Sequence, residues 1–256
     1  MQAKQLMCGA IFNVSDFPLL EPLLEISGYE EADIRKILTK RELRPTDPVL
    51  TLVPTRSGLR LMPATWWLKL DGNTLKPDTR WATFNCRSDH ILTSKLHSIP
   101  PRSYRAIVAA EGFFEWQPIY SGGRLYSALT EAERSKPPRP IAKQRFLVSQ
   151  PGHLLYFGAL CKHWLDEEQQ PRASVGIITL PPHPAFLDVH HKSFPLIIQP
   201  EELTAWMDST RPHSDFSHLF ALNQVRQSME AVAVNEPEFE ALEEAEPLVL
   251  KPVLIG

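Results

Sequence analysis

The chain has 256 residues, of which 43 % are hydrophobic and 22 % are charged. This is the composition of an ordinary globular protein, and it excludes a disordered chain, a collagen-like repeat and a disulfide-rich scaffold. The net charge is −3, but six glutamates fall within residues 236–246, where Lys and Arg are absent, so the rest of the chain carries +3. The overall charge therefore neither favours nor excludes a nucleic-acid partner.

The sequence begins with MQAKQLMCGAIF, which lacks the apolar core of a signal peptide. Nowhere do about 18 consecutive apolar residues occur, so we expect no membrane span. The three cysteines, Cys8, Cys86 and Cys161, are an odd number in a chain of this size, which favours a reducing compartment over a disulfide framework. We therefore expect a cytoplasmic protein.

Proline is abundant, at 24 residues against 11 glycines, and it breaks most apolar runs into the short pieces that suit strands and loops. We expect an α+β fold, rich in strands, in a single domain that spans residues 7–256. In chain order, we expect helices at 18–25, 30–39, 89–94 and 200–207, and strands at 49–53, 104–108, 145–148, 154–157, 175–179 and 196–198. Residues 117–143 are expected to form a surface excursion, and residues 236–246 a solvated acidic segment.

The first candidate for chemistry is Cys8, which follows Met7. Residues 1–6 are then either a leader or a mis-assigned start, and once Met7 is also removed Cys8 carries a free α-amine beside its thiol. Such a 1,2-aminothiol condenses with an aldehyde to an imine and then closes through sulfur to a thiazolidine, which ordinary cysteines cannot do. The alternative is that Cys8 is a small buried residue of a first strand.

The second candidate is Glu115, a lone carboxylate within the aromatic run Gly112-Phe-Phe-Glu-Trp116. Burial of this carboxylate is costly unless the group is paired or functional. In an apolar pocket a carboxyl group can both donate and accept a proton near neutral pH. The alternative is that Glu115 faces solvent from a half-buried strand.

The third candidate is the pair His190 and His191, which precedes an apolar run. Either imidazole could act as a general acid or base. The alternatives are a metal site and a pair of solvated loop histidines. A zinc site would have to recruit Cys161, His153, His163 or His183, but no tight ligand spacing such as CxxC or HExxH occurs. We expect neither a metal nor another cofactor.

A fourth group is polar and aromatic: Asn85 and Arg87 in the run Phe84-Asn-Cys-Arg-Ser-Asp89, and Trp66 with Trp67 upstream. Asn and Arg can hold a sugar or a phosphate, and paired indoles can stack on bases. The alternatives are core packing for the tryptophans and a helix cap for Ser88.

The order of these motifs resembles that of the SOS-response-associated peptidase (SRAP) family, the abasic-site-processing proteins. The motifs are Met-Cys-Gly near the start, Trp-x-Leu, Asn-x-Arg-Ser-Asp, Gly-Phe-Phe-Glu-Trp and His-x-x-x-Pro before an aliphatic run, and the likeness covers nearly the whole chain. The resemblance implies a single α+β domain with a basic DNA groove beside a barrel-like central sheet.

In that family the N-terminal cysteine forms a thiazolidine with the ring-opened aldehyde of an abasic site in single-stranded DNA. By this resemblance Cys8 is the crosslinking nucleophile, Asn85 holds the opened sugar, and Glu115 is the catalytic carboxylate. The spacing to Pro195 implies that His191 is the active-site histidine. Arg87 matches a DNA-phosphate contact, and Trp66 and Trp67 fall on the segment beside the bound strand.

The sequence thus predicts an abasic-site sensor of the DNA damage response, with single-stranded DNA as its partner, no membrane association and a monomeric state. Removal of the leader by the same groups would be a peptidase activity. Two alternatives stay open: a non-catalytic module that binds single-stranded nucleic acid, and an amidohydrolase with an N-terminal cysteine. The second would need an oxyanion hole that the sequence does not reveal.

Overall fold

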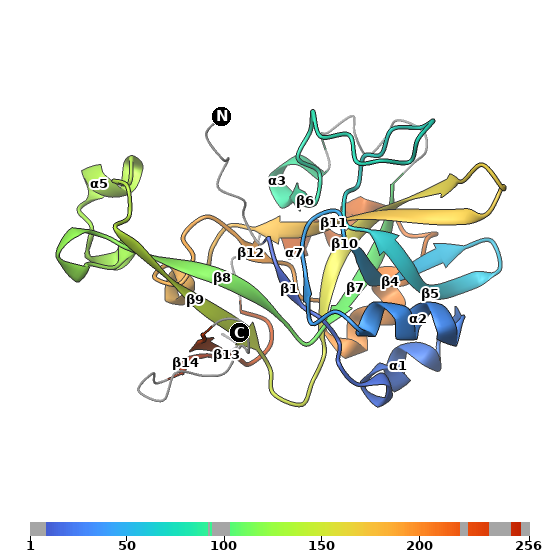
Figure 1. Ribbon diagram of the computed structural model, residues 1–256, viewed down its shortest axis with the longest axis horizontal. Coiled ribbons are helices and arrows are strands. Elements are labelled where there is room, and N and C mark those ends of the chain that lie inside the picture. The colour runs from blue at the N-terminus through green and yellow to red at the C-terminus, as the bar shows by residue number, and fades with distance from the viewer. Residues whose placement is uncertain (1–8, 92, 94–102, 221–224, 236–246, 252–256) are drawn as a thin grey trace.

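The computed structural model describes residues 9–91, 93, 103–220, 225–235 and 247–251 (Figure 1). Its strands form two sheets. The larger sheet has the order β12-β11-β10-β7-β4-β5-β2, and β11 pairs with β5 as well as with β10. The strands β11, β10, β7, β4 and β5 therefore close into a barrel. The short strand β6 pairs in parallel with residues 177–179 of β11. The predicted strand-rich α+β fold with a barrel-like central sheet is confirmed.

The strands of the larger sheet are β2 (Gly28–Tyr29), β4 (Pro48–Thr55), β5 (Gly58–Thr65), β6 (Asn85–Arg87), β7 (Tyr104–Ala110), β10 (Leu155–Leu165), β11 (Pro171–Leu180) and β12 (Phe194–Pro195). The second sheet, in the order β14-β13-β9-β8-β1-β3, consists of β1 (Ile11–Phe12), β3 (Glu42–Leu43), β8 (Gly112–Ile119), β9 (Ala142–Ser149), β13 (Met229–Ala233) and β14 (Leu248–Leu250).

The helices are short and lie around the sheets. The α-helices are α1 (Glu21–Leu24), α2 (Glu31–Leu38), α3 (Ser88–Ile91), α5 (Glu131–Ser135), α6 (Leu203–Met207) and α7 (Ser217–Phe220). The 3₁₀ turns are η1 (Phe17–Leu20), η2 (Ser121–Gly123), η3 (Tyr126–Ala128), η4 (Pro184–Phe186), η5 (Pro200–Glu202) and η6 (His213–Phe216). The predicted helix at 200–207 is confirmed as η5 followed by α6, with Pro200 at its start.

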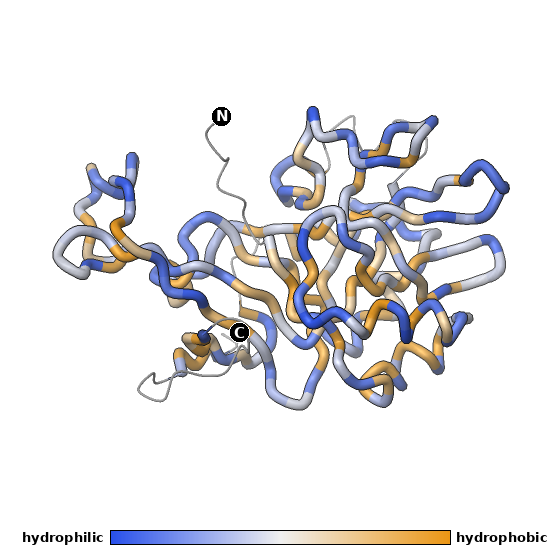
Figure 2. Tube along the Cα trace, in the orientation of Figure 1, coloured by the Kyte–Doolittle hydropathy of each residue, from blue (hydrophilic) through white to orange (hydrophobic). Residues whose placement is uncertain are grey.

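The barrel encloses the main hydrophobic core. Leu52, Ile107, Phe157 and Ile177, from four of its strands, are fully buried. Figure 2 shows apolar residues concentrated in the barrel strands and hydrophilic residues at the hairpin tips. Strands β4, β7, β10 and β11 are buried on both faces over most of their length, because one face points into the barrel and neighbouring elements such as α2 and α6 cover the other.

The expected strand at 196–198 is wrong. Leu196 and Ile198 are fully buried, but their backbone groups bond alternately to two strands, since the Leu196 N–H donates to Ile178 and the Ile198 N–H donates to Tyr156. The segment therefore fills the seam between β10 and β11 instead of forming a ladder with either. Gly158 on β10 makes room for it, because a Cβ there would lie 2.8 Å from Cδ2 of Leu196.

The chain passes from the barrel into the second sheet at Glu111, between β7 and β8. Beyond this point β8 and β9 form a long hairpin that reaches away from the barrel and carries residues 120–141 at its end (Figure 1, left). We call residues 120–141 the arm. The predicted surface excursion at 117–143 is thus largely this arm, although the two strands extend to Ile119 and start again at Ala142.

Candidate functional site

Phe113 brings the second sheet and the loop after β11 together. Its ring centroid lies 6.2 Å from that of Phe186 and 5.8 Å from that of Phe194, so the segment between these two residues is held at both ends. Glu115 follows Phe113 on the same face of β8, because side chains on a strand repeat every second residue. The carboxylate is therefore directed at the loop that contains His190 and His191.

Glu115 and His190 form a buried pair. Nδ1 of His190 donates to Oε2 of Glu115 over 2.9 Å, and the two side chains are 10 % and 2 % exposed, for the histidine and the glutamate respectively. Oε1 of Glu115 and Nε2 of His190 are also buried, and neither has a hydrogen-bond partner among the described residues. Leaving a buried polar atom unpaired costs about 1–3 kcal/mol, so the pair is suited to a ligand that supplies the missing partners.

His191 is the next residue of this loop after His190. Its ring is stacked on Tyr126, with centroids 4.1 Å apart and an interplanar angle of 7°. Burial, followed by the charges of His190 and Lys192, lowers the pKa of His191 to about 4, so its imidazole is neutral at pH 7. Nδ1 of His191 is buried without a partner in the described part of the chain.

These three side chains line a cleft of about 990 Å³ between the hairpin, the arm and the histidine loop. Its lining residues include five cations, namely Arg44, Arg134, Arg139, Lys143 and Lys192, and its single carboxylate is Glu115. The cleft also takes in Trp116 and the prolines of the arm. A cleft with this excess of positive charge is suited to a polyanion.

A smaller hollow of about 160 Å³ adjoins this cleft, because Lys192 lines both. Arg87 lies at its rim, where the guanidinium pairs with Asp89 over 2.6 Å. The hydroxyls of Thr179 and Ser193 line it too, and both are buried without a hydrogen-bond partner among the described residues. Nothing in the sequence singles out these two hydroxyls, since isolated Ser and Thr residues carry no pattern.

Asn85 begins β6 and is paired in register with Ile177 of β11. Asn85 therefore lies on the same short strand as Arg87, and Arg87 lines the smaller hollow. Of the sequence-predicted residues, Glu115, His190 and His191 line the cleft and Arg87 lines the adjoining hollow, whereas Asn85 lines neither cavity.

The tryptophans are not placed for stacking on bases. Trp66 is fully buried and Trp67 is 8 % exposed, and their indole N–H groups donate to the carbonyls of Phe84 and Asp78. The expectation that Trp66 and Trp67 bind DNA through their rings is thus corrected to the alternative, core packing. The physical reason is that a buried indole needs a partner for its N–H, and these two have backbone partners.

The cysteines divide into two classes. Cys86 and Cys161 are buried, and burial raises the pKa of both thiols to about 12, so neither is a nucleophile near neutral pH. Cys8 lies outside the described residues. The described chain starts with Gly9 and Ala10, both buried, and the Ala10 carbonyl accepts a hydrogen bond from the Phe114 N–H, next to Glu115.

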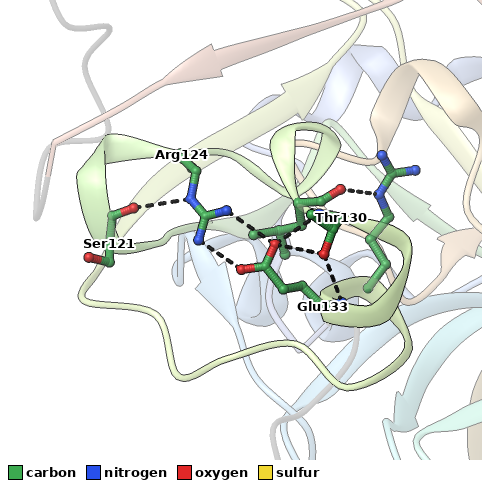
Figure 3. Close-up of polar contacts among 6 residues, drawn as sticks. Ser121, Arg124, Thr130 and Glu133 are labelled. Atoms are coloured by element: carbon green, nitrogen blue, oxygen red, sulfur yellow. Dashed lines mark hydrogen bonds and ion pairs between the residues drawn. The ribbon is translucent and has the colours of Figure 1, made fainter.

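The arm is fastened to the histidine loop and to itself. Asp188 accepts hydrogen bonds from the N–H and the hydroxyl of Ser127, over 2.7 and 2.8 Å. Within the arm, Arg124 and Glu133 form a two-fold ion pair, and Thr130 caps α5 through a reciprocal bond with Glu133 (Figure 3). Tyr126 and Ser127 carry no local signal in the sequence, because their contacts are with residues about 60 positions away.

Across the described residues, no group of three or more His, Cys, Asp or Glu side chains is arranged to hold a metal ion. Within the same residues no helix has the length and apolarity needed to cross a membrane.

Comparison with known proteins agrees with this architecture. A protein from Bacteroides thetaiotaomicron is similar to the chain with a TM-score of 0.65 at 14 % identity, covering 90 % of this chain and 93 % of that one. A protein from Bordetella bronchiseptica has a TM-score of 0.61 at 14 % identity, with 89 % and 100 % covered. A phage-related protein from the same organism has a TM-score of 0.51 at 20 % identity, with 83 % and 87 % covered. No curated protein matches the sequence.

The family model of the SOS response associated peptidase matches residues 7–237, so the match begins at Met7, directly before Cys8. This range contains β1, β8 with Glu115, and the histidine loop. The chain belongs to the SOS response associated peptidase (SRAP) family, a family associated with the response to DNA damage.

Proposed function

We propose that the protein recognises abasic sites in single-stranded DNA and links to them covalently through Cys8, once Cys8 is the N-terminal residue. The observation that carries the proposal is the buried Glu115–His190 pair, which lines a cationic cleft and has atoms on both side chains without a partner among the described residues. A family match that begins at Met7 supports Cys8 as the first residue of the working protein.

The chemistry needs groups that move protons in both directions. The α-amine of Cys8 adds to the aldehyde of the opened sugar, and the resulting carbinolamine takes up a proton and loses water to leave an iminium ion. The thiol then adds to the iminium carbon and gives up its proton to a base, and a neutral thiazolidine results. Nδ1 of His190 and Oε2 of Glu115 lie 2.9 Å apart, so together the two side chains can supply a proton at the dehydration step and accept one at ring closure.

The position of the first strand supports the assignment of these roles. Ala10 is hydrogen-bonded to Phe114, the residue before Glu115, and Gly9 is buried beside it. Cys8 is bonded directly to Gly9. We therefore assign Cys8 as the residue that works with Glu115. Cys86 and Cys161 are excluded from this role by burial and by their raised thiol pKa values.

Exposure of the Cys8 amine requires removal of the residues before it, and we propose that the same site does this. The Cys8 thiol attacks the Met7 carbonyl, the C–N bond breaks as His190 protonates the departing amine, and water hydrolyses the thioester. Intact mass spectrometry of purified protein should show a chain that starts at Cys8. Retention of Met1 in protein that forms the crosslink would contradict this step.

A denaturing-gel assay tests the main proposal. Full-length protein and protein produced with Cys8 as its first residue are incubated with single-stranded DNA that carries one abasic site. We expect a heat-stable adduct with both forms if trimming is autocatalytic, and no adduct with Cys8→Ala. The matched control is Cys161→Ala, which removes a buried thiol and should leave the adduct unchanged.

Absence of an adduct with the form that starts at Cys8, in protein that still binds DNA, would contradict the crosslinking proposal. It would favour the alternative of a non-catalytic single-stranded DNA-binding protein. The cationic cleft would serve either function.

A further inference from the structure

We infer that the arm, residues 120–141, together with Lys143 at the start of β9, forms one wall of the DNA-binding cleft and contacts the phosphates of the strand beside the abasic site. This inference rests on the proposed function, and it assigns a binding role to a segment outside the Glu115–His190 pair. The ligand chemistry is a single-stranded phosphodiester chain.

The first support for this inference is the positive charge along the cleft. Arg139 of the arm and Lys143, at the start of β9 beside it, are exposed cations that line the cleft. Neither side chain forms an ion pair or a hydrogen bond within the described part of the chain. Charged side chains that have no carboxylate partner, and face a cleft, are suited to phosphates.

The cations are also close enough to repel one another. Lys143 and Lys192 both line the cleft, and after burial the charge of Lys143 is the next cause that lowers the pKa of Lys192. The charge of Glu115 acts on Lys192 in the opposite direction, and a bound phosphate would further offset the repulsion between the two lysines. The cleft volume of about 990 Å³ exceeds what a single phosphate would occupy, so a chain of nucleotides fits it better than a small anion.

The position of these cations is fixed by the fold. Lys143 pairs in register with Pro118, three residues along β8 from Glu115, which corresponds to about 10 Å. The arm cannot swing freely, because Asp188 holds Ser127 and Tyr126 stacks on His191. The Arg124–Glu133 pair and the Thr130 cap hold the arm's own shape (Figure 3).

Rigidity matters because ordering a mobile segment on binding costs free energy. Prolines 137, 138 and 140 flank Arg139 and restrict its backbone. The arm therefore presents its cations to the cleft already in place.

The test compares two variants by fluorescence anisotropy, with labelled undamaged single-stranded DNA at several salt concentrations. The double variant Arg139→Ala/Lys143→Ala removes two cations from the cleft. The matched control, Lys136→Ala, removes an exposed cation of the same arm that does not line the cleft. Both changes are at exposed positions, and circular dichroism before and after heating checks that each variant folds as the wild type does.

We expect the double variant to bind at least about tenfold more weakly at low salt. Its slope of log affinity against log salt concentration should fall by about 1.4, because each phosphate of a single strand that a cation neutralises accounts for about 0.7 of that slope. The control should keep the wild-type affinity and slope. Equal affinity and slope in the double variant and the wild type would overturn the inference.

The two proposals can fail separately. If the wild type crosslinks abasic DNA but the double variant shows an unchanged salt slope, the arm inference is overturned and the crosslinking function stands. If the double variant loses salt-dependent affinity but no wild-type adduct forms, the arm inference stands and the crosslinking proposal fails.

Discussion

The Glu115–His190 pair is the most informative feature at the level of single residues. A buried carboxylate and a buried imidazole that pair with each other satisfy one atom on each side chain, and the other two atoms stay unpartnered among the described residues. A purely structural pair would be expected to complete its hydrogen bonds, because unpaired buried groups destabilise the fold. The site therefore retains capacity for a ligand at a cost in stability.

The two adjacent histidines can be separated experimentally. The family resemblance predicts His191 from its spacing to Pro195, whereas the structure pairs Glu115 with His190. Because a proton passes most directly along a hydrogen bond, we expect His190→Gln to slow adduct formation by about 10²–10⁴-fold, the usual contribution of general acid–base catalysis. His191→Gln should slow it by less than about tenfold. Single-turnover gel kinetics with the form that starts at Cys8 measure both rates.

The reverse order, with His191→Gln the slower variant, would assign the proton transfer to His191 and leave His190 as its positioning partner. Salt-dependent DNA binding serves as the control, since both variants keep the cations of the cleft. A large loss of DNA binding in either variant would point to a disrupted loop instead.

His191 also predicts a pH dependence of stability. Its pKa is lowered from 6.5 in an unfolded chain to about 4 in the folded protein, so the unfolded state binds a proton first as pH falls. The stabilising contribution is fully present above pH 6.5 and is lost progressively between pH 6.5 and about pH 4. Urea unfolding across this range should give a shallower decline for His191→Gln than for the wild type. An identical decline in the two proteins would show that His191 is solvated in the folded state.

At the level of secondary structure, local signals predicted most strands and distant contacts decided the rest. The β-branched runs at 49–53 and 175–179 became β4 and β11, because their period and composition suit a buried strand without further help. The run at 196–198 has the same composition but fills a seam between two strands, which depends on Gly158 and could not be seen locally.

The candidate site shows the same contrast between residues that local sequence predicts and features that depend on distant contacts. Glu115 could be predicted because a carboxylate interrupts an aromatic run, and the histidines because they stand together. The residues around the two histidines do not decide which one pairs with Glu115, because the pairing depends on how Phe113 packs against the two ends of their loop. The burial of Trp66 likewise depends on a carbonyl 18 residues away.

The turn into β8 gives a stability prediction. A Cβ at Gly112 would lie 2.5 Å from the carbonyl oxygen of Val148, which is backbone of the paired strand and cannot move cheaply. We expect Gly112→Ala to lower the free energy of unfolding by about 1–3 kcal/mol through overpacking. Gly72→Ala is the matched control, because a Cβ there meets nothing within 4 Å. Urea denaturation measures both, and equal midpoints would show that β8 and β9 can separate to admit the methyl group.

For the whole molecule, a closed barrel supports a site that lies outside it. The chain leaves the barrel at Glu111, and within a few residues Phe113 packs against the loop from the far end of β11. The catalytic candidates are therefore attached to the rigid part of the molecule, while the arm projects from it (Figure 1). A rigid support of this kind suits proton transfer, which depends on distances of about 3 Å.

This division predicts a gradient of amide hydrogen exchange. Strands β7 and β10 are paired on both sides and buried, so their amides should exchange with the free energy of global unfolding. The arm has short turns and exposed residues, so its amides should exchange through local opening and faster than those of the barrel.

Asp188→Ala removes both bonds to Ser127 and should speed exchange within 120–135, with the barrel unchanged. Asp208→Ala is the matched control, because Asp208 likewise accepts from an N–H and a hydroxyl, those of Thr210, away from the arm. Unchanged arm exchange in Asp188→Ala would mean that Tyr126 and the internal pairs of the arm suffice to hold it against the site.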